Sequence, residues 1–355
     1  MPSNVSVEYS RAQQKYAEAR TNAEKLAALQ GMWSVAPSHK GAENLRAEIT
    51  RKMAALRKLI EKEKAQSKKK GSAPSMHVKK EGCAQVVLVG LPNSGKSSLL
   101  NSLTGINAAV APYPFTTIKP EIGMMNFKGA LVQLVEVPAI IEGSAGGRAQ
   151  GTQLFSVIRN ADAIILVVRN PDEEKILLNE LGKAGIKANK KRPAIQVRPA
   201  EFKGITIAGK RFLKMPEAEF IEFLKGLGIH SASVLLNEPT TTEKVLETLD
   251  DSLVYRKALT VNPFIEKDIP LLKEKIFALL ERILVYTKKP GKDADMNEPL
   301  ALKKGSTVES VAKLLHKDFA QNLRYVKLWG SGKFPAQRVA KNYRLKGGDI
   351  IEIYS

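Results

Sequence analysis

The sequence GLPNSGKS, at residues 90–97, fits the pattern G-x-x-x-x-G-K-[ST] at every fixed position. The apolar run 86–89 precedes it and predicts a strand buried on both faces of a sheet, while 98–103 predicts a helix after it. This order of strand, glycine-rich turn and helix is the context in which the pattern marks a phosphate-binding loop. The segment therefore predicts an α/β fold built around a nucleotide phosphate site.

The residues of this loop supply the chemistry of a phosphate site. Gly90 and Gly95 allow the backbone to curl so that its N–H groups face a phosphate at the helix N-terminus. Lys96 supplies a positive charge to the β- and γ-phosphates, and Ser97 offers a hydroxyl to Mg²⁺. The other phosphate-binding residues that we predict are Asn93, Ser94 and Ser98.

Outward from the loop, short apolar runs alternate with helical segments, which is typical of a doubly wound sheet. Two short strands flank Lys128-Gly129, and 163–168 predicts another buried strand. A strand at 256–261 and a helix at 269–283 close a P-loop domain that we expect to span 83–287. Residues 173–240 predict an inserted α+β subdomain, with helices at 173–184 and 216–227 and an extended segment at 195–207.

The regions before and after the P-loop domain differ from it in their pattern of predicted helices and strands. Residues 7–32 and 42–66 predict two helices joined by a Pro- and Gly-containing turn, a helical hairpin, followed by a basic linker that ends the region 1–80. Beyond Pro290-Gly291, short strands alternate with one helix at 308–317, which predicts a separate C-terminal domain over 288–355.

Charge and composition narrow the class of partner. The chain of 355 residues carries 56 Lys and Arg against 36 Asp and Glu, a net charge of +20. Residues 1–80 hold 17 of these cations against 7 acids, and 290–355 hold 12 against 7. Such a field favours polyanions such as RNA. A solvated basic surface without a partner explains the charge equally well.

Membrane and extracellular classes are disfavoured. The apolar runs are too short to cross a bilayer, and the N-terminus has no apolar signal segment, so we expect no membrane partner. Cys83 is the single cysteine and cannot form an internal disulfide, which fits a reducing cytoplasm. The sequence has no Cys/His cluster for zinc, and its four scattered histidines suggest no catalytic base.

Five stretches of the sequence form a set with a characteristic order and spacing. They are 38–63, GLPNSGKSSLLNSLTG at 90–105, YPFTT at 113–117, IIEGSA at 140–145, and VYTKKPG at 285–291 with LLHKDF, VKLWGSGKFPAQRV and LKGGDIIEIY after it. Together they resemble the Obg-like GTPases of the developmentally regulated GTP-binding (DRG) type. The last of them resembles the C-terminal TGS domain, a ubiquitin-like β-grasp module. The resemblance implies a Mg²⁺-dependent GTP-binding protein of translation that engages ribosomes, RNA or a protein partner through its TGS domain and N-terminal helices.

The resemblance also implies roles for single residues. Thr116 or Thr117 of the switch I segment would close on Mg²⁺ and the γ-phosphate, with Thr117 the metal ligand beside Ser97. Asn93 lies where potassium-stimulated relatives carry a K⁺-coordinating asparagine, although turn geometry explains this residue equally well. Ile140 falls where Ras-like enzymes place a water-orienting glutamine, so intrinsic hydrolysis should be slow.

Switch II departs from the family pattern. The family segment begins Asp-x-Pro-Gly, whereas this chain has Glu136, Val137, Pro138 and Ala139. Glu136 keeps a carboxylate near Mg²⁺, one methylene longer, so we expect metal binding with altered geometry. The family glycine gives its N–H to the γ-phosphate and lets the backbone rotate, and the Cβ of Ala139 restricts that rotation. We therefore expect a blunted response to GTP.

The guanine-reading motif Asn-Lys-x-Asp is degenerate. Its place is taken by Asn262-Pro263-Phe264-Ile265, and Asn237-Glu238-Pro239-Thr240 is a second candidate that fits its surroundings less well. Neither has the aspartate whose carboxylate accepts two guanine N–H groups, so discrimination between GTP and ATP should weaken. The helix predicted to begin at Ile269 also leaves no room for the family's next strand and its base-contacting loop.

The C-terminal domain offers a candidate surface for RNA or another partner. Phe334, Arg338, Lys341 and Arg344 suggest a basic RNA face, with a solvated strand surface as the equal alternative. We assign Trp329 to the core of the sheet in preference to a base-stacking role.

Two functions remain open from the sequence. The first is a slow Mg²⁺-dependent GTPase, or a nucleoside triphosphatase with relaxed base choice that also accepts ATP, acting with the ribosome or RNA. The second is a pseudo-GTPase, a scaffold that keeps the fold and binds its partner without productive switching. The intact phosphate loop favours the first.

Overall fold

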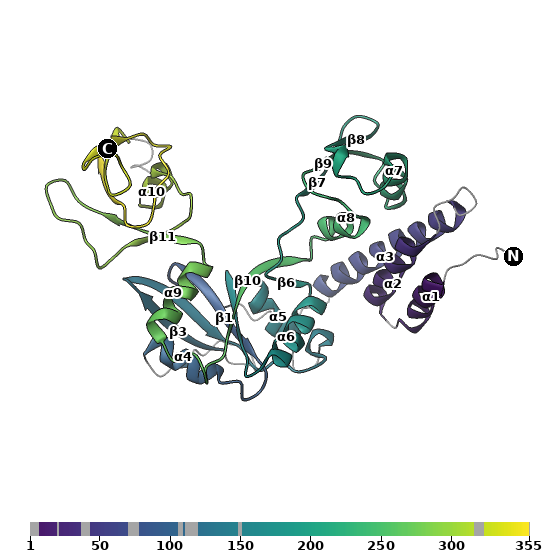
Figure 1. Cartoon of the computed structure of the whole chain (residues 1–355), viewed down its shortest axis with the longest axis horizontal. Coiled ribbons are helices and arrows are strands. Elements are labelled where there is room, and N and C mark those ends of the chain that lie inside the picture. Colours follow the sequence, from purple (N-terminus) through teal and green to yellow (C-terminus); the bar gives the residue numbers. More distant parts are fainter. Residues whose placement is uncertain are drawn as a thin grey trace. The chain divides into compact units, whose positions relative to one another are not determined.

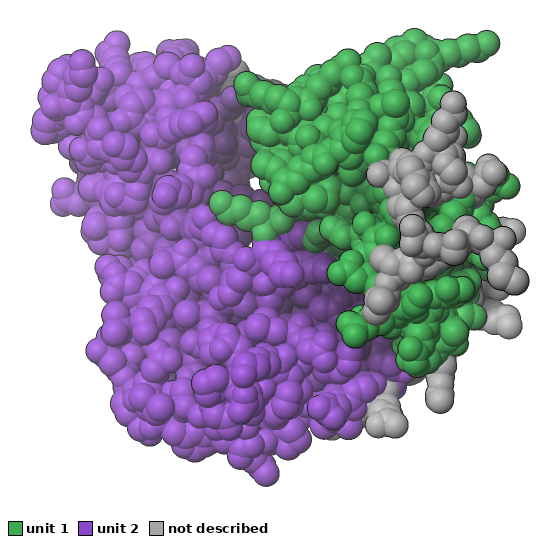
Figure 2. Space-filling view, turned by 45° about the vertical axis from the view of Figure 1, so that its right-hand side comes forward, with its two compact units in different colours: residues 1–73, 191–253 green, residues 74–190, 254–355 purple. Residues whose placement is uncertain are grey.

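The computed structural model (Figure 1) describes residues 7–19, 21–36, 43–69, 78–105, 109–110, 120–147, 151–315 and 323–354. The chain divides into two compact units, each made of segments that are far apart in the sequence (Figure 2). Unit 1 comprises Met1–Ala73 and Lys191–Leu253, and unit 2 comprises Pro74–Lys190 and Val254–Ser355. Unit 2 contains the phosphate loop and the C-terminal domain.

A seven-stranded sheet in the order β2-β3-β4-β1-β5-β10-β6 forms the centre of unit 2. β3 is antiparallel to both of its neighbours, and the strands from β4 to β6 along this order are parallel. β1 and β5 are buried along their whole length, as predicted for strands covered on both faces. The strands are β1 (Ala84–Gly90), β2 (Ala109–Val110), β3 (Glu121–Phe127), β4 (Ala130–Glu136), β5 (Ala163–Val167), β6 (Ile186–Ala188) and β10 (Val254–Val261).

Helices cover both faces of this sheet, which confirms the doubly wound prediction. Alternate side chains of a strand point to opposite faces, and Val86 and Val87 of β1 accordingly enter two different cores. Val86 packs with α4 (Lys96–Thr104) and α9 (Ile269–Leu279), and Val87 packs with α5 (Gly151–Asn160) and α6 (Pro171–Lys183).

The inserted subdomain differs in extent from the prediction of 173–240. α6 and β6 belong to unit 2, because Leu177 and Ile186 are buried in the core beneath the sheet. The insertion instead covers 191–253. It contains a three-stranded sheet in the order β7-β9-β8, made of β7 (Ile195–Pro199), β8 (Gly204–Ala208) and β9 (Ser231–Leu236), with helices α7 (Glu217–Gly226) and α8 (Thr242–Leu249).

The N-terminal region has three helices over its described residues instead of the two predicted. The expected helix 7–32 is divided into α1 (Val7–Glu18) and α2 (Asn22–Val35), and α3 (Glu43–Lys69) follows. The division occurs because Thr21 caps α2: its hydroxyl accepts the Glu24 N–H at 3.1 Å, and its own N–H donates to the Glu24 carboxylate at 3.2 Å. Within unit 1, Met53 of α3 and Phe220 of α7 share one buried core.

The C-terminal domain is a five-stranded sheet in the order β12-β11-β15-β13-β14, packed against α10 (Val308–Leu315), and it confirms the predicted β-grasp. Val311 of α10 meets Leu328 and Ile351 of the sheet in its core. The domain begins at β11, before the predicted boundary at 288, and the predicted helix end at Lys317 lies outside the described residues. The strands are β11 (Arg282–Thr287), β12 (Leu300–Lys303), β13 (Tyr325–Trp329), β14 (Gln337–Val339) and β15 (Ile350–Tyr354).

Candidate functional site

The phosphate loop joins β1 to α4 with the backbone shape that its glycines permit. A Cβ on Gly90 would lie 2.4 Å from the Ser94 hydroxyl and 2.6 Å from the Val167 carbonyl, so only glycine fits there. Gly95 precedes the first turn of α4 with a φ of 89°, in the left-handed region. Asn93 also has a positive φ, of 59°, which asparagine tolerates better than most residues. Turn geometry therefore gives Asn93 a structural role of its own.

Lys96 is buried beneath this loop. Its ammonium group donates to the carbonyl oxygens of Leu91 at 3.1 Å and Gly90 at 3.5 Å, and it forms no salt bridge with any described residue. Burial lowers the pKa of Lys96, and the nearby charge of Glu136 partly opposes that shift. A desolvated cation bonded only to carbonyls gains free energy from an anion, so the loop is suited to phosphate.

Two of the three residues predicted to hold Mg²⁺, Ser97 and Glu136, meet at the end of β4. The Ser97 hydroxyl donates to Oε1 of Glu136 at 2.9 Å, and Oε2 of Glu136 is buried without a hydrogen-bond partner in the described part of the chain. Burial and then the charge of Glu121 raise the pKa of Glu136, against the opposing Ser97 hydrogen bond and the Lys96 charge. A carboxylate and a hydroxyl are oxygen ligands that Mg²⁺ prefers, so this pair fits the ion.

Switch II is held against the sheet in this structure. Ile140 is buried in the core shared with α5 and α6, and its N–H donates to the Gly90 carbonyl at 3.1 Å. Pro138 and Ala139, which precede it, are partly exposed. Ile140 therefore serves packing and has no group that could orient water. The switch I residues Thr116 and Thr117 lie outside the described residues.

A buried glutamate that the sequence analysis missed anchors the continuation of switch II. Glu180 of α6 is 1% exposed and accepts the Ala145 N–H at 3.0 Å. Lys183 donates to its other oxygen at 3.0 Å. No local sequence pattern predicts this contact, because Ala145 and Glu180 are 35 positions apart. The 3₁₀ turn Ser144–Gly146 is thereby tied to the helix layer.

The structure brings Asn262, and not Asn237, to the sheet that carries the phosphate loop. Asn262 directly follows β10, whereas Asn237 belongs to unit 1. After β10 the chain enters α9 at Ile269 with no intervening strand, and residues 262–269 are all described. The family's additional strand is therefore absent from this stretch, as predicted.

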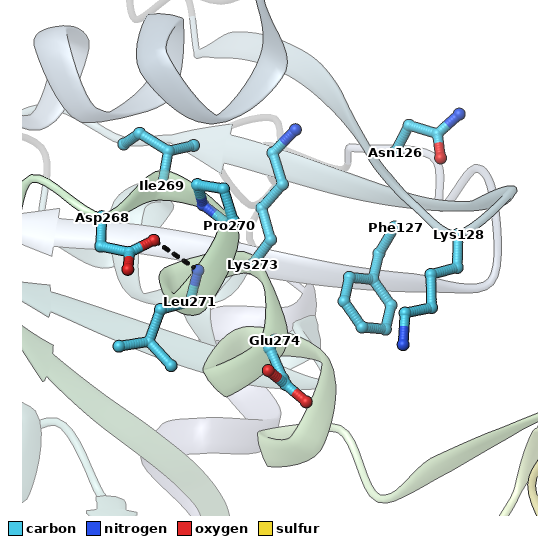
Figure 3. A pocket seen from close by; sticks show the side chains of 9 residues that line it. All are labelled: Asn126, Phe127, Lys128, Asp268, Ile269, Pro270, Leu271, Lys273 and Glu274. Atoms are coloured by element: carbon cyan, nitrogen blue, oxygen red, sulfur yellow. Dashed lines mark hydrogen bonds between the residues drawn. The ribbon is translucent and has the colours of Figure 1, made fainter.

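A separate hollow of about 480 Å³ lies between the β3–β4 turn and the start of α9 (Figure 3). Phe127 and Lys128 line one side, and Ile269 and Lys273 line the other. None of its lining residues belongs to the phosphate loop. This hollow is therefore distinct from the nucleotide site.

The prediction that Trp329 belongs to the core is wrong. Val326 and Leu328 of β13 are buried in the core of the C-terminal domain, so Trp329, at the alternate position, lies on the opposite face of the sheet. The Lys288 ammonium lies 4.2 Å from the centre of its ring. The tryptophan is therefore partly exposed beside a cation.

The same face carries one of the predicted basic residues. The Arg338 guanidinium lies 4.3 Å above the ring of Tyr325, which in turn stacks on Tyr354 with 4.5 Å between ring centres. Lys341 and Arg344 follow β14, and their main chains pair with Glu309 and Thr307 at the start of α10. The structure thus places Arg338 among aromatic rings and the other two predicted residues in a connecting segment.

None of the described helices is long and apolar enough to cross a membrane. The part of the chain that the structure describes holds no group of three or more His, Cys, Asp and Glu that could bind a metal ion. Cys83 is a partly buried free thiol, and burial raises its pKa.

Two family models match the chain. The first is described as 50S ribosome-binding GTPase and covers residues 85–198, and the second is the TGS domain and covers residues 283–355. The first match covers β1 to β6 of the phosphate-loop sheet and extends into β7 of the insertion, but it does not include β10. The second match covers the C-terminal β-grasp domain.

Curated relatives align over most of their length. An uncharacterized GTP-binding protein of Methanocaldococcus jannaschii is 34% identical over 350 residues, which is 89% of this chain and 88% of that protein. Developmentally-regulated GTP-binding protein 2 of Homo sapiens is 30% identical over 324 residues, 83% of this chain and 88% of that protein. The developmentally-regulated GTP-binding protein 1 homolog of Dictyostelium discoideum is 30% identical over 317 residues, 80% and 85% of the two chains.

Proposed function

Because this chain belongs to the Obg/DRG family of GTP-binding proteins with a C-terminal TGS domain, we propose that it is a slow Mg²⁺-dependent nucleoside triphosphatase that acts with RNA of the translation machinery. The observation that carries the proposal is the buried ammonium of Lys96, whose only hydrogen-bond partners in the described part of the chain are the carbonyls of Gly90 and Leu91. GTP is the nucleotide of the family, and ATP is an alternative substrate because the base-reading motif is degenerate.

In this proposal each residue of the loop has one task. Lys96 and the N–H groups at the start of α4 hold the phosphates, and Ser97 with Glu136 holds Mg²⁺, which neutralises charge on the phosphate oxygens. Thr117 is the further proposed metal ligand. Ile140 offers no group for orienting the attacking water, so turnover without a partner is slow. K⁺ coordinated by Asn93 is one proposed stimulant, and the ribosome is another.

Turnover of GTP and ATP tests this function directly. Wild-type protein with Mg²⁺ should release phosphate slowly, faster in KCl than in NaCl or faster with ribosomes, and Lys96→Ala should abolish release. The control is Lys175→Ala, which changes an exposed lysine on α6. An absence of turnover with either nucleotide under all these conditions would reject the enzymatic proposal.

The RNA partner is supported by the charge of the chain and by its C-terminal sheet. Arg338 and Lys288 lie on aromatic rings of one face, a combination that suits single-stranded RNA. The excess of cations in 1–80 suggests a second contact through the N-terminal helices. RNA binding should weaken steeply with salt, whereas binding that is insensitive to salt would favour a protein partner. The cytoplasm is the proposed location, because translation takes place there.

The pseudo-GTPase alternative is favoured by a specific feature of switch II. Ile140 is buried, its N–H bonds to the Gly90 carbonyl, and Ala139 replaces the mobile glycine of the family. A segment held in this way responds weakly to nucleotide. Co-sedimentation of the Lys96→Ala variant with ribosomes separates the two proposals, because unchanged sedimentation favours a scaffold and its loss favours a nucleotide-dependent switch.

A further inference from the structure

The polar groups of Asn262, in the loop between β10 and α9, already form hydrogen bonds within the protein. Nδ2 of Asn262 donates to the Arg169 carbonyl at 2.9 Å, and Oδ1 accepts the Phe264 N–H at 3.0 Å. The Asn262 carbonyl also accepts the N–H groups of Ile265 and Glu266, at 3.1 and 2.9 Å. These bonds fold residues 262–266 into a tight turn, so the Asn262 side chain serves the turn and not a base.

The two carboxylates that follow are also engaged. Glu266 accepts the Asn262 N–H at 3.3 Å through one oxygen and pairs with Lys275 at 3.0 Å through the other. Asp268 caps α9 by accepting the Leu271 N–H at 2.9 Å, a contact drawn in Figure 3. Neither can replace the missing aspartate without giving up a bond that shapes the loop or the helix. Hydrogen-bonded reading of guanine therefore has no carboxylate in this stretch.

What this loop does present to the phosphate site is apolar. A Cβ built on Gly95 would lie 2.8 Å from Cγ of Pro263 and 3.5 Å from Cζ of Phe264, so both side chains lie against the phosphate loop. Phe264 is nevertheless 57% exposed and the adjacent Ile265 is 75% exposed. An aromatic ring thus rests on the rim of the loop with much of its surface open to solvent.

We propose that Phe264 is a stacking surface for the base of a nucleoside di- or triphosphate whose phosphates occupy the loop 90–97. This inference rests on the proposed function, since it requires that loop to hold phosphate. A nucleotide bound by its phosphates carries its base one ribose away from the loop rim, where the ring lies. Every base has a π-face, and stacking therefore tolerates any base. The chemical class of ligand is a nucleotide of any base, held by stacking in place of guanine-specific hydrogen bonds.

The test compares ligands that have a base with one that has none. Dissociation constants for GTP, ATP, UTP and inorganic tripolyphosphate, all with Mg²⁺, are measured by calorimetry on the full chain. We expect Phe264→Ala to weaken binding of all three nucleotides by about tenfold or more and to leave tripolyphosphate binding unchanged. Phe202→Ala is the matched control, because Phe202 is also exposed, at 47%, but lies between β7 and β8 of unit 1.

The outcomes are distinguishable. Unchanged nucleotide binding by Phe264→Ala would overturn the inference. Tighter binding would overturn it too, because the ring of Phe264 would then obstruct the site. Parallel loss of tripolyphosphate binding would overturn it too, since the ring would then only support the loop. If wild type binds tripolyphosphate but gains nothing from a base, the proposed phosphate site stands and this inference fails. If wild type binds neither, the proposed function fails with it.

A second variant gives a direct signal. Phe264→Trp keeps an aromatic surface, so its nucleotide affinity should stay close to that of wild type. Its fluorescence, taken as the difference from wild type, should change on addition of GTP or ATP and stay constant with tripolyphosphate. A constant signal with bound nucleotide would mean that the base lies elsewhere.

Discussion

The hydroxyl of Ser97 donates a 2.9 Å hydrogen bond to Oε1 of Glu136, although Glu136 is one methylene longer than the aspartate of the family at this position. The longer side chain therefore still reaches the serine of the phosphate loop. Its second oxygen is buried and has no hydrogen-bond partner among the described residues. A buried carboxylate oxygen without a partner is costly, and a bound cation removes that cost.

Glu136→Gln tests the role of this carboxylate. The amide keeps the size of the side chain but removes its charge, so the Mg²⁺ affinity of the nucleotide complex should fall by about 10- to 100-fold. Nucleotide binding without Mg²⁺ should stay close to that of wild type. Titration of Mg²⁺ into the protein with bound fluorescent nucleotide measures both, with Asp172→Asn, at an exposed carboxylate of α6, as the control. Equal Mg²⁺ affinity in wild type and Glu136→Gln would remove Glu136 from the metal site.

Gly95→Ala tests the shape of the phosphate loop. The new Cβ would lie 2.8 Å from Cγ of Pro263, and the alanine would have to adopt a φ of 89°. We therefore expect a loss of about 1–3 kcal/mol in the free energy of unfolding and a large loss of nucleotide affinity. Gly105→Ala, at the other end of α4, is the control, because its φ is 71° and no described heavy atom lies within 4 Å. The Gly105→Ala variant should lose stability but keep its nucleotide affinity. Normal nucleotide affinity in Gly95→Ala would contradict the contact with the loop 262–265.

Glu180→Gln tests the anchor of switch II. Burial acts to raise the pKa of Glu180, but hydrogen bonds from the Ala145 N–H and from Lys183 outweigh it and hold that pKa below its ordinary 4.5. A carboxyl with a lowered folded-state pKa stabilises the protein above its unfolded pKa, and this contribution disappears as pH falls through the folded value. The variant should lose about 1–3 kcal/mol of unfolding free energy at neutral pH.

The difference between Glu180→Gln and wild type should shrink as pH falls below 4.5, the ordinary value of this carboxyl. Urea unfolding at a series of pH values measures it, and Asp172→Asn, exposed on the same helix, is the control. A difference that stays constant with pH would show that the Glu180 charge does not contribute.

Arg338→Ala and Tyr325→Ala separate charge from stacking in the proposed RNA contact. Removing the guanidinium should weaken RNA binding across sequences and lower the slope of log affinity against log salt by about one. Removing the ring of Tyr325 should weaken binding and leave that slope unchanged. Filter binding of single-stranded RNA measures both, with Lys303→Ala on β12 as the control. If both variants bound RNA with the affinity of wild type, this face of the sheet would be excluded as the RNA-binding surface.

Short-range patterns allowed much of this fold to be predicted. The phosphate loop, the buried strands beside it and the hairpin at Lys128-Gly129 follow from local residue order, and the hairpin turn has φ values of 50° and 87° as such a two-residue turn requires. The division between α1 and α2 at Thr21 could also have been predicted from the sequence, because Thr21 and Glu24 form a capping box. The prediction of one helix over 7–32 overlooked that signal.

What could not be predicted depends on contacts between distant residues. Leu177 places α6 in the core of unit 2 and so moves the start of the insertion to 191. Glu180 reaches Ala145, and Arg338 reaches Tyr325, only through the tertiary fold. Trp329 was assigned to the core of the sheet, whereas the alternation of β13 places it on the opposite face.

The most direct test of the account is the affinity of the wild-type chain for GTP and ATP, measured side by side with Mg²⁺ in KCl. The phosphate loop keeps every fixed residue of its pattern, and no aspartate occupies the position that reads guanine. Both nucleotides should therefore bind, with dissociation constants within about tenfold of each other, because a site without hydrogen bonds to the base discriminates weakly. A preference for GTP of more than about a thousandfold would contradict it, since only specific hydrogen bonds give such a ratio.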